Sequence, residues 1–148
     1  MAPLIALIVG SALARLAGLA GITALDGWHP ALRVGLALMF AVTGIAHFVG
    51  RRRVDLIAMV PPRLPRPDPL VTLTGVLELA GAVGLLIPTT ARLAAAGLGL
   101  LMLVMFPANV SAARRRLTLA GRPVTPLGQR TILQLVFVAT AAAISFGP

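Results

Sequence analysis

Residues 93–113 read LAAAGLGLLMLVMFPANVSAA, a continuous apolar stretch without a single charged side chain. A helix needs about 20 such residues to cross the roughly 30 Å of hydrocarbon in a bilayer. Four other apolar runs cover approximately residues 3–25, 30–50, 69–87 and 131–146. None of them alternates polar and apolar residues as a strand of a membrane barrel does, and helices are the other form that satisfies the backbone in lipid. The sequence therefore predicts an all-α transmembrane bundle of five helices.

The composition agrees with a membrane location for almost the whole chain. Apolar residues make up 58% of its 148 residues and charged residues only 11%, whereas a soluble domain carries about 25% charged residues. The length suffices for a single domain. Because the chain has no cysteine, it supplies no disulfide, no thiolate nucleophile and no ligand for an iron–sulfur cluster.

The formal net charge of +9 comes from thirteen arginines, most of which lie in two connecting segments, residues 51–66 and 114–130. A nucleic-acid-binding protein places its cations on a folded soluble face, and no such face is present, so we exclude nucleic acid as a partner. Basic segments that flank apolar runs are typical of cytoplasmic loops. This pattern predicts a multi-pass protein of the bacterial cytoplasmic (plasma) membrane, with its N-terminus inside and its C-terminus outside. The arginines assigned to the cytoplasmic loops are Arg51, Arg52, Arg53, Arg114, Arg115 and Arg116.

The chain divides into an N-terminal helix with its outer loop, residues 1–29, and a membrane core, residues 30–148. The first apolar run lacks the basic region that precedes the apolar part of a signal peptide, and Arg15 lies in its middle. We therefore expect this helix to be retained, with cleavage as the alternative. In either case the four remaining helices form a complete bundle.

The connector at residues 51–69 has a charged start, an apolar stretch over residues 54–60 and a series of prolines after it. Proline blocks the continuation of a helix. The pattern favours a short helix lying in the inner membrane interface, followed by a stiff extended arm. A passive connector is the alternative, and both interpretations stay open.

Glu78 is the most unusual residue of the sequence, because it lies near the middle of an apolar run. Ionisable groups inside a membrane are expensive and usually face the interior of the bundle, where they find a partner. The depths of the side chains along their helices predict a pair between Glu78 and Arg15, with Arg33 as the second choice. A protonated Glu78 is the alternative. Its carboxyl group is either a polar clamp that fixes helix packing or a group that relays protons or binds a ligand.

Small and polar residues form a stripe on one helical face of several apolar runs. Small residues let helix backbones approach, and polar side chains then meet across the contact, so these stripes predict the packed faces. In the second run the stripe consists of Arg33, Ala37, Phe40, Gly44 and His47. The corresponding stripes are Ser11, Ala14, Arg15 and Gly18 in the first run, Thr74, Gly75, Glu78, Gly81 and Ala82 in the third, and Gln134, Val138, Ala141 and Ser145 in the fifth.

The histidines and Asn109 do not form a recognisable catalytic or metal site. His47 and His29 would lie about 27 Å apart along one helix, so they cannot bind one metal or haem iron. We interpret His47 as an interfacial hydrogen-bonding group, with a proton carrier as the alternative. Asn109 follows Pro107, which frees a backbone carbonyl, and Asn109 either satisfies freed groups or bonds to another helix. No cofactor is identifiable, and a quinone is supported by no motif.

Several short motifs of the core occur in a fixed order. Residues 32–33, Phe40 and the sequence GIAHF at 44–48 precede MVPPRLP at 59–65, LTGVLELAG at 73–81, FPANV at 106–110 and the pair LQ at 133–134. Together these motifs resemble the DoxX-like family of small bacterial integral membrane proteins. The resemblance covers approximately residues 30–146. It implies a four-helix core, to which the first apolar run adds one extra N-terminal transmembrane helix.

The resemblance also implies a role near redox chemistry. The family takes its name from a subunit linked to thiosulfate:quinone oxidoreduction, and some relatives are described as membrane components of redox or oxidative-stress complexes. Our leading hypothesis is a non-catalytic membrane subunit or anchor of such a complex, embedded in the lipid bilayer, with a redox protein bound at the cytoplasmic face. Any redox role then comes through that partner or a bound quinone, and enzyme activity of the chain alone is not expected.

Two other functional hypotheses stay open on the sequence. One is a small proton-coupled transporter or carrier that uses Glu78, because ionisable groups inside a membrane often mark a transport path. The other is a purely structural or lipid-sensing membrane protein. Each of them is compatible with a homo-oligomer.

Overall fold

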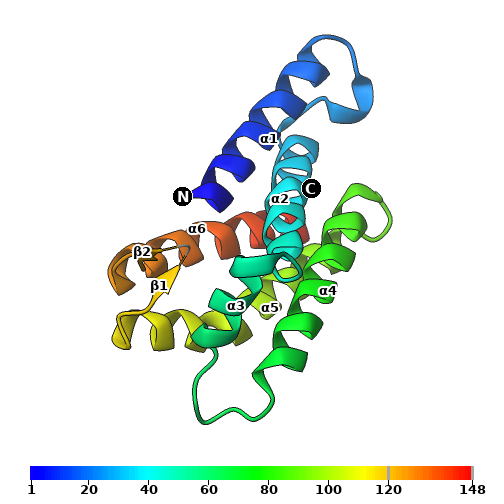
Figure 1. Cartoon of the computed structure of the whole chain (residues 1–148). Helices are drawn as coiled ribbons and strands as arrows, with labels where there is room; N and C mark the ends of the chain where they lie inside the picture. Colours follow the sequence, from blue (N-terminus) through cyan, green and yellow to red (C-terminus); the bar gives the residue numbers. More distant parts are fainter. Residues whose placement is uncertain (120, 148) are drawn as a thin grey trace.

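The structure, a computed structural model, describes residues 1–119 and 121–147 and is almost entirely helical (Figure 1). The predicted all-α class is confirmed. A hairpin of two very short antiparallel strands precedes the last helix. In chain order the elements are α1 (Ala2–Leu19), the 3-10 turn η1 (Thr23–Leu25), α2 (Trp28–Ala46), α3 (Gly50–Met59), α4 (Pro67–Leu86), α5 (Ala91–Arg114), β1 (Thr118–Leu119), β2 (Arg122–Pro123) and α6 (Leu127–Phe146).

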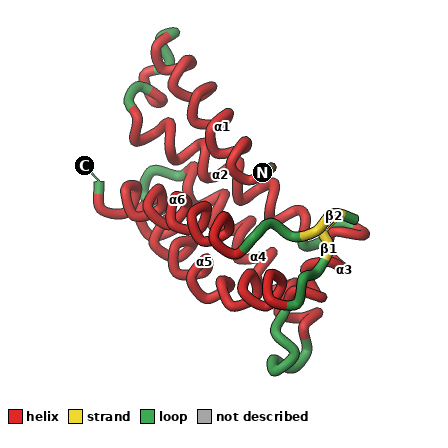
Figure 2. Tube along the Cα trace, turned by 90° about the vertical axis from the view of Figure 1, so that its left-hand side faces the viewer, coloured by secondary structure: helices red, strands yellow, loops and turns green. Residues whose placement is uncertain are grey.

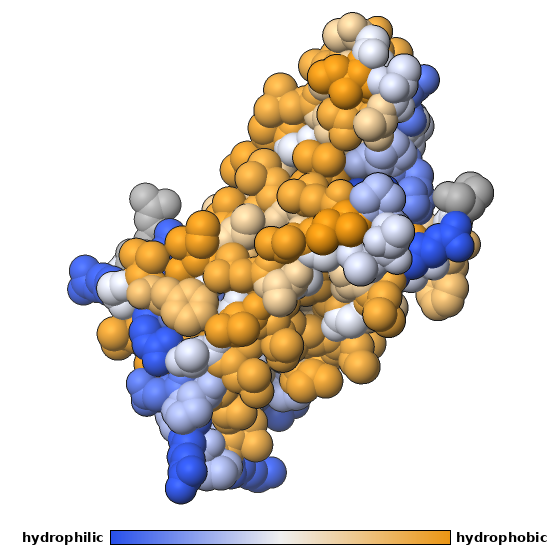
Figure 3. Space-filling model, turned by 90° about the vertical axis from the view of Figure 1, so that its right-hand side faces the viewer, coloured by the Kyte–Doolittle hydropathy of each residue, from blue (hydrophilic) through white to orange (hydrophobic). Residues whose placement is uncertain are grey.

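Five of these helices, α1, α2, α4, α5 and α6, are long and apolar enough to cross a membrane. They correspond to the five predicted runs, and the largest difference is in the first, where α1 ends at Leu19 and η1 follows. Large apolar side chains such as Leu93 and Ile132 stay exposed on them. Figure 3 shows hydrophobic residues covering the middle of the flank, with hydrophilic residues at its lower left and along its right-hand edge. A water-soluble monomer rarely exposes so much continuous apolar surface, and this flank is suited to contact lipid.

Glycine and proline set several of the helix boundaries. Gly21 and Gly27 both have φ of +105°, a left-handed conformation that glycine adopts without strain, and they lie in the turn between α1 and α2. Pro67 and Pro69 lie in the first turn of α4, where an amide hydrogen has no helical acceptor and its loss is tolerated.

Helix α2 is the centre of the bundle. It packs against α1, α4 and α6, while α5 packs against α4 and α6. Figures 1 and 2 both show α1 beside α2 and away from α5. The largest fully buried side chains are Leu36 of α2, Leu85 of α4 and Ile144 of α6. The core therefore lies around α2 and includes residues of α4, α5 and α6, and α1 adds Leu7 to it.

Small residues bring α1 and α2 into close contact. A Cβ atom on Gly35 would collide with the hydroxyl oxygen of Ser11, and a Cβ atom on Gly10 would lie 2.9 Å from the Cα atom of Gly35. Both positions therefore need glycine at this distance between the helices. Ser11, Ala14 and Gly18 are buried on the same face of α1, which confirms three of the four residues of the predicted stripe; the fourth, Arg15, is only partly buried.

The connections between helices gather at two ends of the bundle. We call one the arginine-rich end, which contains residues 47–66, 114–119 and 121–126. The opposite end contains residues 20–27, 87–90 and 147. The two predicted basic segments are thus on the same end of the fold.

Helix α3 confirms the short helix predicted in the connector. It packs against α4 and α5 at the arginine-rich end. The proline segment after it is not the predicted extended arm. The amide of Leu64 donates to the carbonyl of Pro61 at 2.9 Å and closes a turn. Proline fixes φ near the value that turns require at their second position, which explains why the segment bends instead of extending.

We expect Gly35→Ala to weaken the contact between α1 and α2, because the added Cβ would collide with Ser11 Oγ. Overpacking of this kind costs about 1–3 kcal/mol of the free energy of unfolding. The measurement is unfolding in mild detergent titrated with dodecyl sulfate. Gly97→Ala is the matched control, since a Cβ there meets nothing within 4 Å. Equal effects of the two substitutions would contradict the close α1–α2 contact.

Candidate functional site

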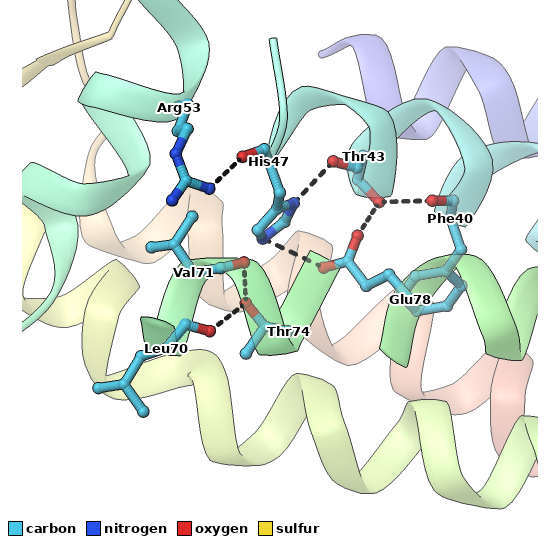
Figure 4. Close-up of polar contacts among 8 residues, drawn as sticks. All are labelled: Phe40, Thr43, His47, Arg53, Leu70, Val71, Thr74 and Glu78. Carbon is cyan, nitrogen blue, oxygen red and sulfur yellow. Dashed lines mark hydrogen bonds and ion pairs between the residues drawn. The ribbon is translucent and has the colours of Figure 1, made fainter. Parts of the chain in front are cut away.

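Two ionisable side chains, His47 and Glu78, are buried side by side between α2 and α4 (Figure 4). His47 follows the last residue of α2, Glu78 lies in the middle of α4, and they are 3% and 4% exposed. Nε2 of His47 lies 3.8 Å from Oε1 of Glu78. The hydroxyl of Thr43 donates to Oε2 of Glu78 at 2.6 Å. We call Thr43, His47 and Glu78 the α2–α4 cluster.

The geometry of the α2–α4 cluster suits one shared proton. Nδ1 of His47 lies 2.9 Å from the carbonyl oxygen of Thr43, which only accepts, so Nδ1 carries a hydrogen. With one proton between Nε2 and the carboxyl group, Nε2 either carries a second hydrogen and faces a carboxylate, or accepts from a protonated carboxyl group. Both of these arrangements leave the pair with zero net charge, whereas loss of the shared proton leaves it with a charge of −1. Since 3.8 Å exceeds a direct hydrogen bond, proton transfer requires the side chains to approach by roughly 1 Å.

Each buried ionisable side chain faces a glycine of the opposite helix. A Cβ atom on Gly75 of α4 would lie 2.5 Å from Cβ of His47. A Cβ atom on Gly44 of α2 would lie 3.3 Å from Cβ of Glu78 and 2.8 Å from a methyl group of Leu79. In both helices the glycine precedes the ionisable residue by three positions, so the two share a face. The structure confirms these two predicted faces and brings them together.

Arg53 of α3 closes the arginine-rich side of the α2–α4 cluster. Its guanidinium donates to the carbonyl oxygen of His47 at 2.9 Å and to the hydroxyl of Thr72 at 3.0 Å. It also lies 3.9 Å from the carboxylate of Asp68. The carbonyl of His47 has no partner within α2, and a cation there complements the helix dipole. Arg53, predicted only as a basic loop residue, therefore links α3 to both α2 and α4.

The predicted partners of Glu78 are wrong. Arg15 instead pairs with Asp26 at 2.8 Å, and Arg33 donates to the carbonyl oxygen of Leu85 at 3.0 Å. The prediction used depth along each helix as its criterion. Which side chains meet also depends on which helices are neighbours, and the partner of α1 is α2, whereas Glu78 lies on α4.

Arginine side chains bond to carbonyl groups at the C-terminal ends of four helices, and sequence reasoning missed this pattern. Each arginine lies outside the helix whose terminal carbonyl group accepts its hydrogen bond. The last carbonyls of a helix have no intrahelical donor, and a guanidinium supplies several donors together with a favourable charge. The bonds are Arg53 to His47 of α2, Arg115 to Ala58 of α3, Arg33 to Leu85 of α4 and Arg92 to Gly147 after α6, at 2.8–3.0 Å.

Asn109 and Gln134 make polar contacts between α5 and α6. Arg130 donates to Oδ1 of Asn109, and Nε2 of Gln134 donates to the carbonyl oxygen of Met102 at 2.7 Å. Helix α5 continues through Pro107 without a break. The contact of Asn109 fits the second of its two predicted roles, a bond to another helix.

The remaining predicted loop residues Arg51, Arg52, Arg114 and Arg116 differ from the arginines at helix ends. All four are exposed. None of them makes a hydrogen bond or ion pair within the part of the chain that the structure describes. Their charges are therefore concentrated at the arginine-rich end without a partner from this chain.

No group of three metal-ligating side chains occurs in residues 1–119 and 121–147. His29 lies at the opposite end of α2 from His47, and its Nε2 is 3.1 Å from the carbonyl oxygen of Ile144. The two histidines are therefore parts of separate polar contacts.

We expect Thr43 and Glu78 to be energetically coupled. Thr43→Val removes the hydroxyl donor, and Glu78→Met removes the acceptor at similar volume. Hydrogen bonds between transmembrane helices contribute about 0.6 kcal/mol on average and up to about 1.7 kcal/mol. A double-mutant cycle measured by dodecyl sulfate unfolding should give a coupling energy in this range.

A second cycle with Thr140→Val and Glu78→Met is the control, because the Thr140 hydroxyl bonds to the carbonyl of Val136 in its own helix. This cycle should be additive. Additivity of both cycles would contradict the hydrogen bond between Thr43 and Glu78.

Comparison with known proteins gives one match. No curated protein and no solved structure matches the chain. A family model described as "Domain of unknown function (DUF8561)" matches residues 36–145, about three quarters of the sequence. The matched region contains all of the α2–α4 cluster and Arg53, while α1 lies outside it. The chain therefore belongs to the DUF8561 family.

Proposed function

We propose that this protein is a non-catalytic membrane subunit or anchor of a redox or oxidative-stress-related complex, with a soluble redox protein bound at its arginine-rich end. The order of motifs that resembles the DoxX-like family supports the redox context. The exposed arginines support the arginine-rich end as the place where the partner binds. In this proposal the chain lies in a bacterial cytoplasmic membrane, with the arginine-rich end inside and the C-terminus outside.

The observation that carries the proposal is the position of Arg51 and Arg52. Both lie in the first turn of α3, where no acidic residue accompanies them. The N-terminus of a helix has a partial positive charge, so cations there destabilise the helix. Neither side chain has a partner within the described part of this chain. An acidic surface of another protein would offset this unfavourable charge, and complementary charges also accelerate association.

We expect an oxidoreductase to co-purify with the protein from native membranes in mild detergent and to be lost when Arg51 and Arg52 are both changed to Gln. Mass spectrometry identifies and quantifies the partner. The double change to Lys is the matched control, because it keeps both charges, and it should retain most of the partner. Purification of the wild-type protein without a reproducible oxidoreductase would contradict the proposal.

The α2–α4 cluster favours a second candidate, a small proton-coupled carrier. A buried imidazole and a buried carboxyl group can each take up and release a proton, as the groups of proton relays inside membranes do. In the present arrangement Gly44 and Gly75 keep the helices in contact around the pair, and Arg53 bonds to the backbone at its arginine-rich side. A carrier would have to open the arginine-rich side of the α2–α4 cluster to water. A proton that enters from that side would reach His47 before Glu78.

The carrier hypothesis predicts proton flux into proteoliposomes that contain a pH-sensitive dye when a membrane potential is imposed. Glu78→Gln should reduce the flux to that of protein-free vesicles, because the amide cannot take up the proton. Thr140→Val should leave the flux unchanged. Wild-type protein with no flux above protein-free vesicles, or a Glu78→Gln variant with full flux, would exclude a proton path through Glu78.

A further inference from the structure

A cavity of about 320 Å³ lies at the arginine-rich end between the end of α5 and the start of α6. We call it the hairpin cavity, since the β1–β2 hairpin connects the two helices there. Arg114 and Arg116 line it on the α5 side, and Leu117, Val124 and Leu127 supply apolar walls. It does not include any residue of the α2–α4 cluster.

The hairpin cavity has a positive potential that no lining residue compensates. None of its lining residues is acidic, and both of its arginines lack a partner within the described part of the chain. Arg116 has φ of +51°, a left-handed conformation uncommon for a residue other than glycine, in the turn that leaves α5. Helix α6 begins at the cavity with no side-chain cap and no acidic residue in its first turn, so its free amides add to the potential.

The apolar wall of the hairpin cavity leads into the membrane. Leu127, which lines the cavity, is the first residue of α6, a helix long and apolar enough to cross a bilayer. Leu135 lies about two turns further along α6, and it is 63% exposed. A ligand with an anionic head and hydrocarbon chains would match a basic cavity that continues into the apolar surface of α6.

We propose that the hairpin cavity binds the phosphate group of an anionic phospholipid between Arg114 and Arg116, with its acyl chains along α6. Basic pockets between membrane helices are suited to such head groups. An acidic protein surface fits less well, because the site is concave, has apolar walls and lies where α6 enters the bilayer. The site does not use Arg51 or Arg52, so it goes beyond the proposed function and leaves the partner surface on α3 unoccupied.

The test is native mass spectrometry of the full chain titrated with phosphatidylglycerol, phosphatidylcholine or inorganic phosphate. Wild-type protein should bind one phosphatidylglycerol in clear preference to phosphatidylcholine. Since each arginine near an anionic lipid contributes about fivefold to affinity, the double change of Arg114 and Arg116 to Gln should weaken phosphatidylglycerol binding about thirtyfold. The double change of Arg51 and Arg52 to Gln removes the same charge elsewhere and should leave this binding intact.

Val124→Trp is a second variant that fills the hairpin cavity without changing charge, and it should also lose the preferred lipid. Dodecyl sulfate unfolding checks that each variant is folded. Equal losses in both arginine double variants would overturn the proposal in favour of nonspecific attraction. Displacement of the lipid by millimolar inorganic phosphate would identify a free-anion site instead. Unchanged lipid binding together with loss of the redox partner in the Arg114 and Arg116 variant would assign the cavity to a protein contact.

Discussion

Transmembrane helices gain little from hiding apolar side chains from lipid, so they associate through close packing and polar contacts. In this protein glycines make that close packing possible. Gly35 allows α1 to approach α2, and Gly44 and Gly75 allow α2 to approach α4. Each of the last two faces an ionisable side chain of the other helix. The burial of His47 and Glu78 beside each other is therefore a consequence of backbone contact, and side chains at the two glycine positions would force the helices apart.

Ten of the thirteen arginines fall into two groups with different physical roles. Four of them satisfy carbonyl groups at helix ends, which have no intrahelical donor. Six others at the arginine-rich end are exposed and have no partner within the described residues, namely Arg51, Arg52, Arg63, Arg66, Arg114 and Arg116. Only the second group leaves donors free for a protein or a lipid.

Helix α3 connects the proposed docking end with the buried polar cluster. Its first turn carries the exposed side chains of Arg51 and Arg52, and the next residue, Arg53, bonds to the carbonyl of His47. A partner that binds the first two arginines would therefore act on the helix that holds the end of α2 in place. The anchor and carrier hypotheses thus involve adjacent residues of one short helix, although they require different chemistry from it.

The sequence by itself determined the class of protein, the number of membrane-crossing helices and the faces on which they pack. These follow from local patterns, because hydropathy over about 20 residues and a period of 3.6 residues do not depend on neighbours. The faces of Gly44 with His47 and of Gly75 with Glu78 were predictable for this reason. Only the tertiary structure decided that these two faces meet, that Arg15 pairs with Asp26, and which arginine reaches which helix end. Contacts of this kind depend on which helices are adjacent, and side chains as long as arginine reach partners far away in the sequence.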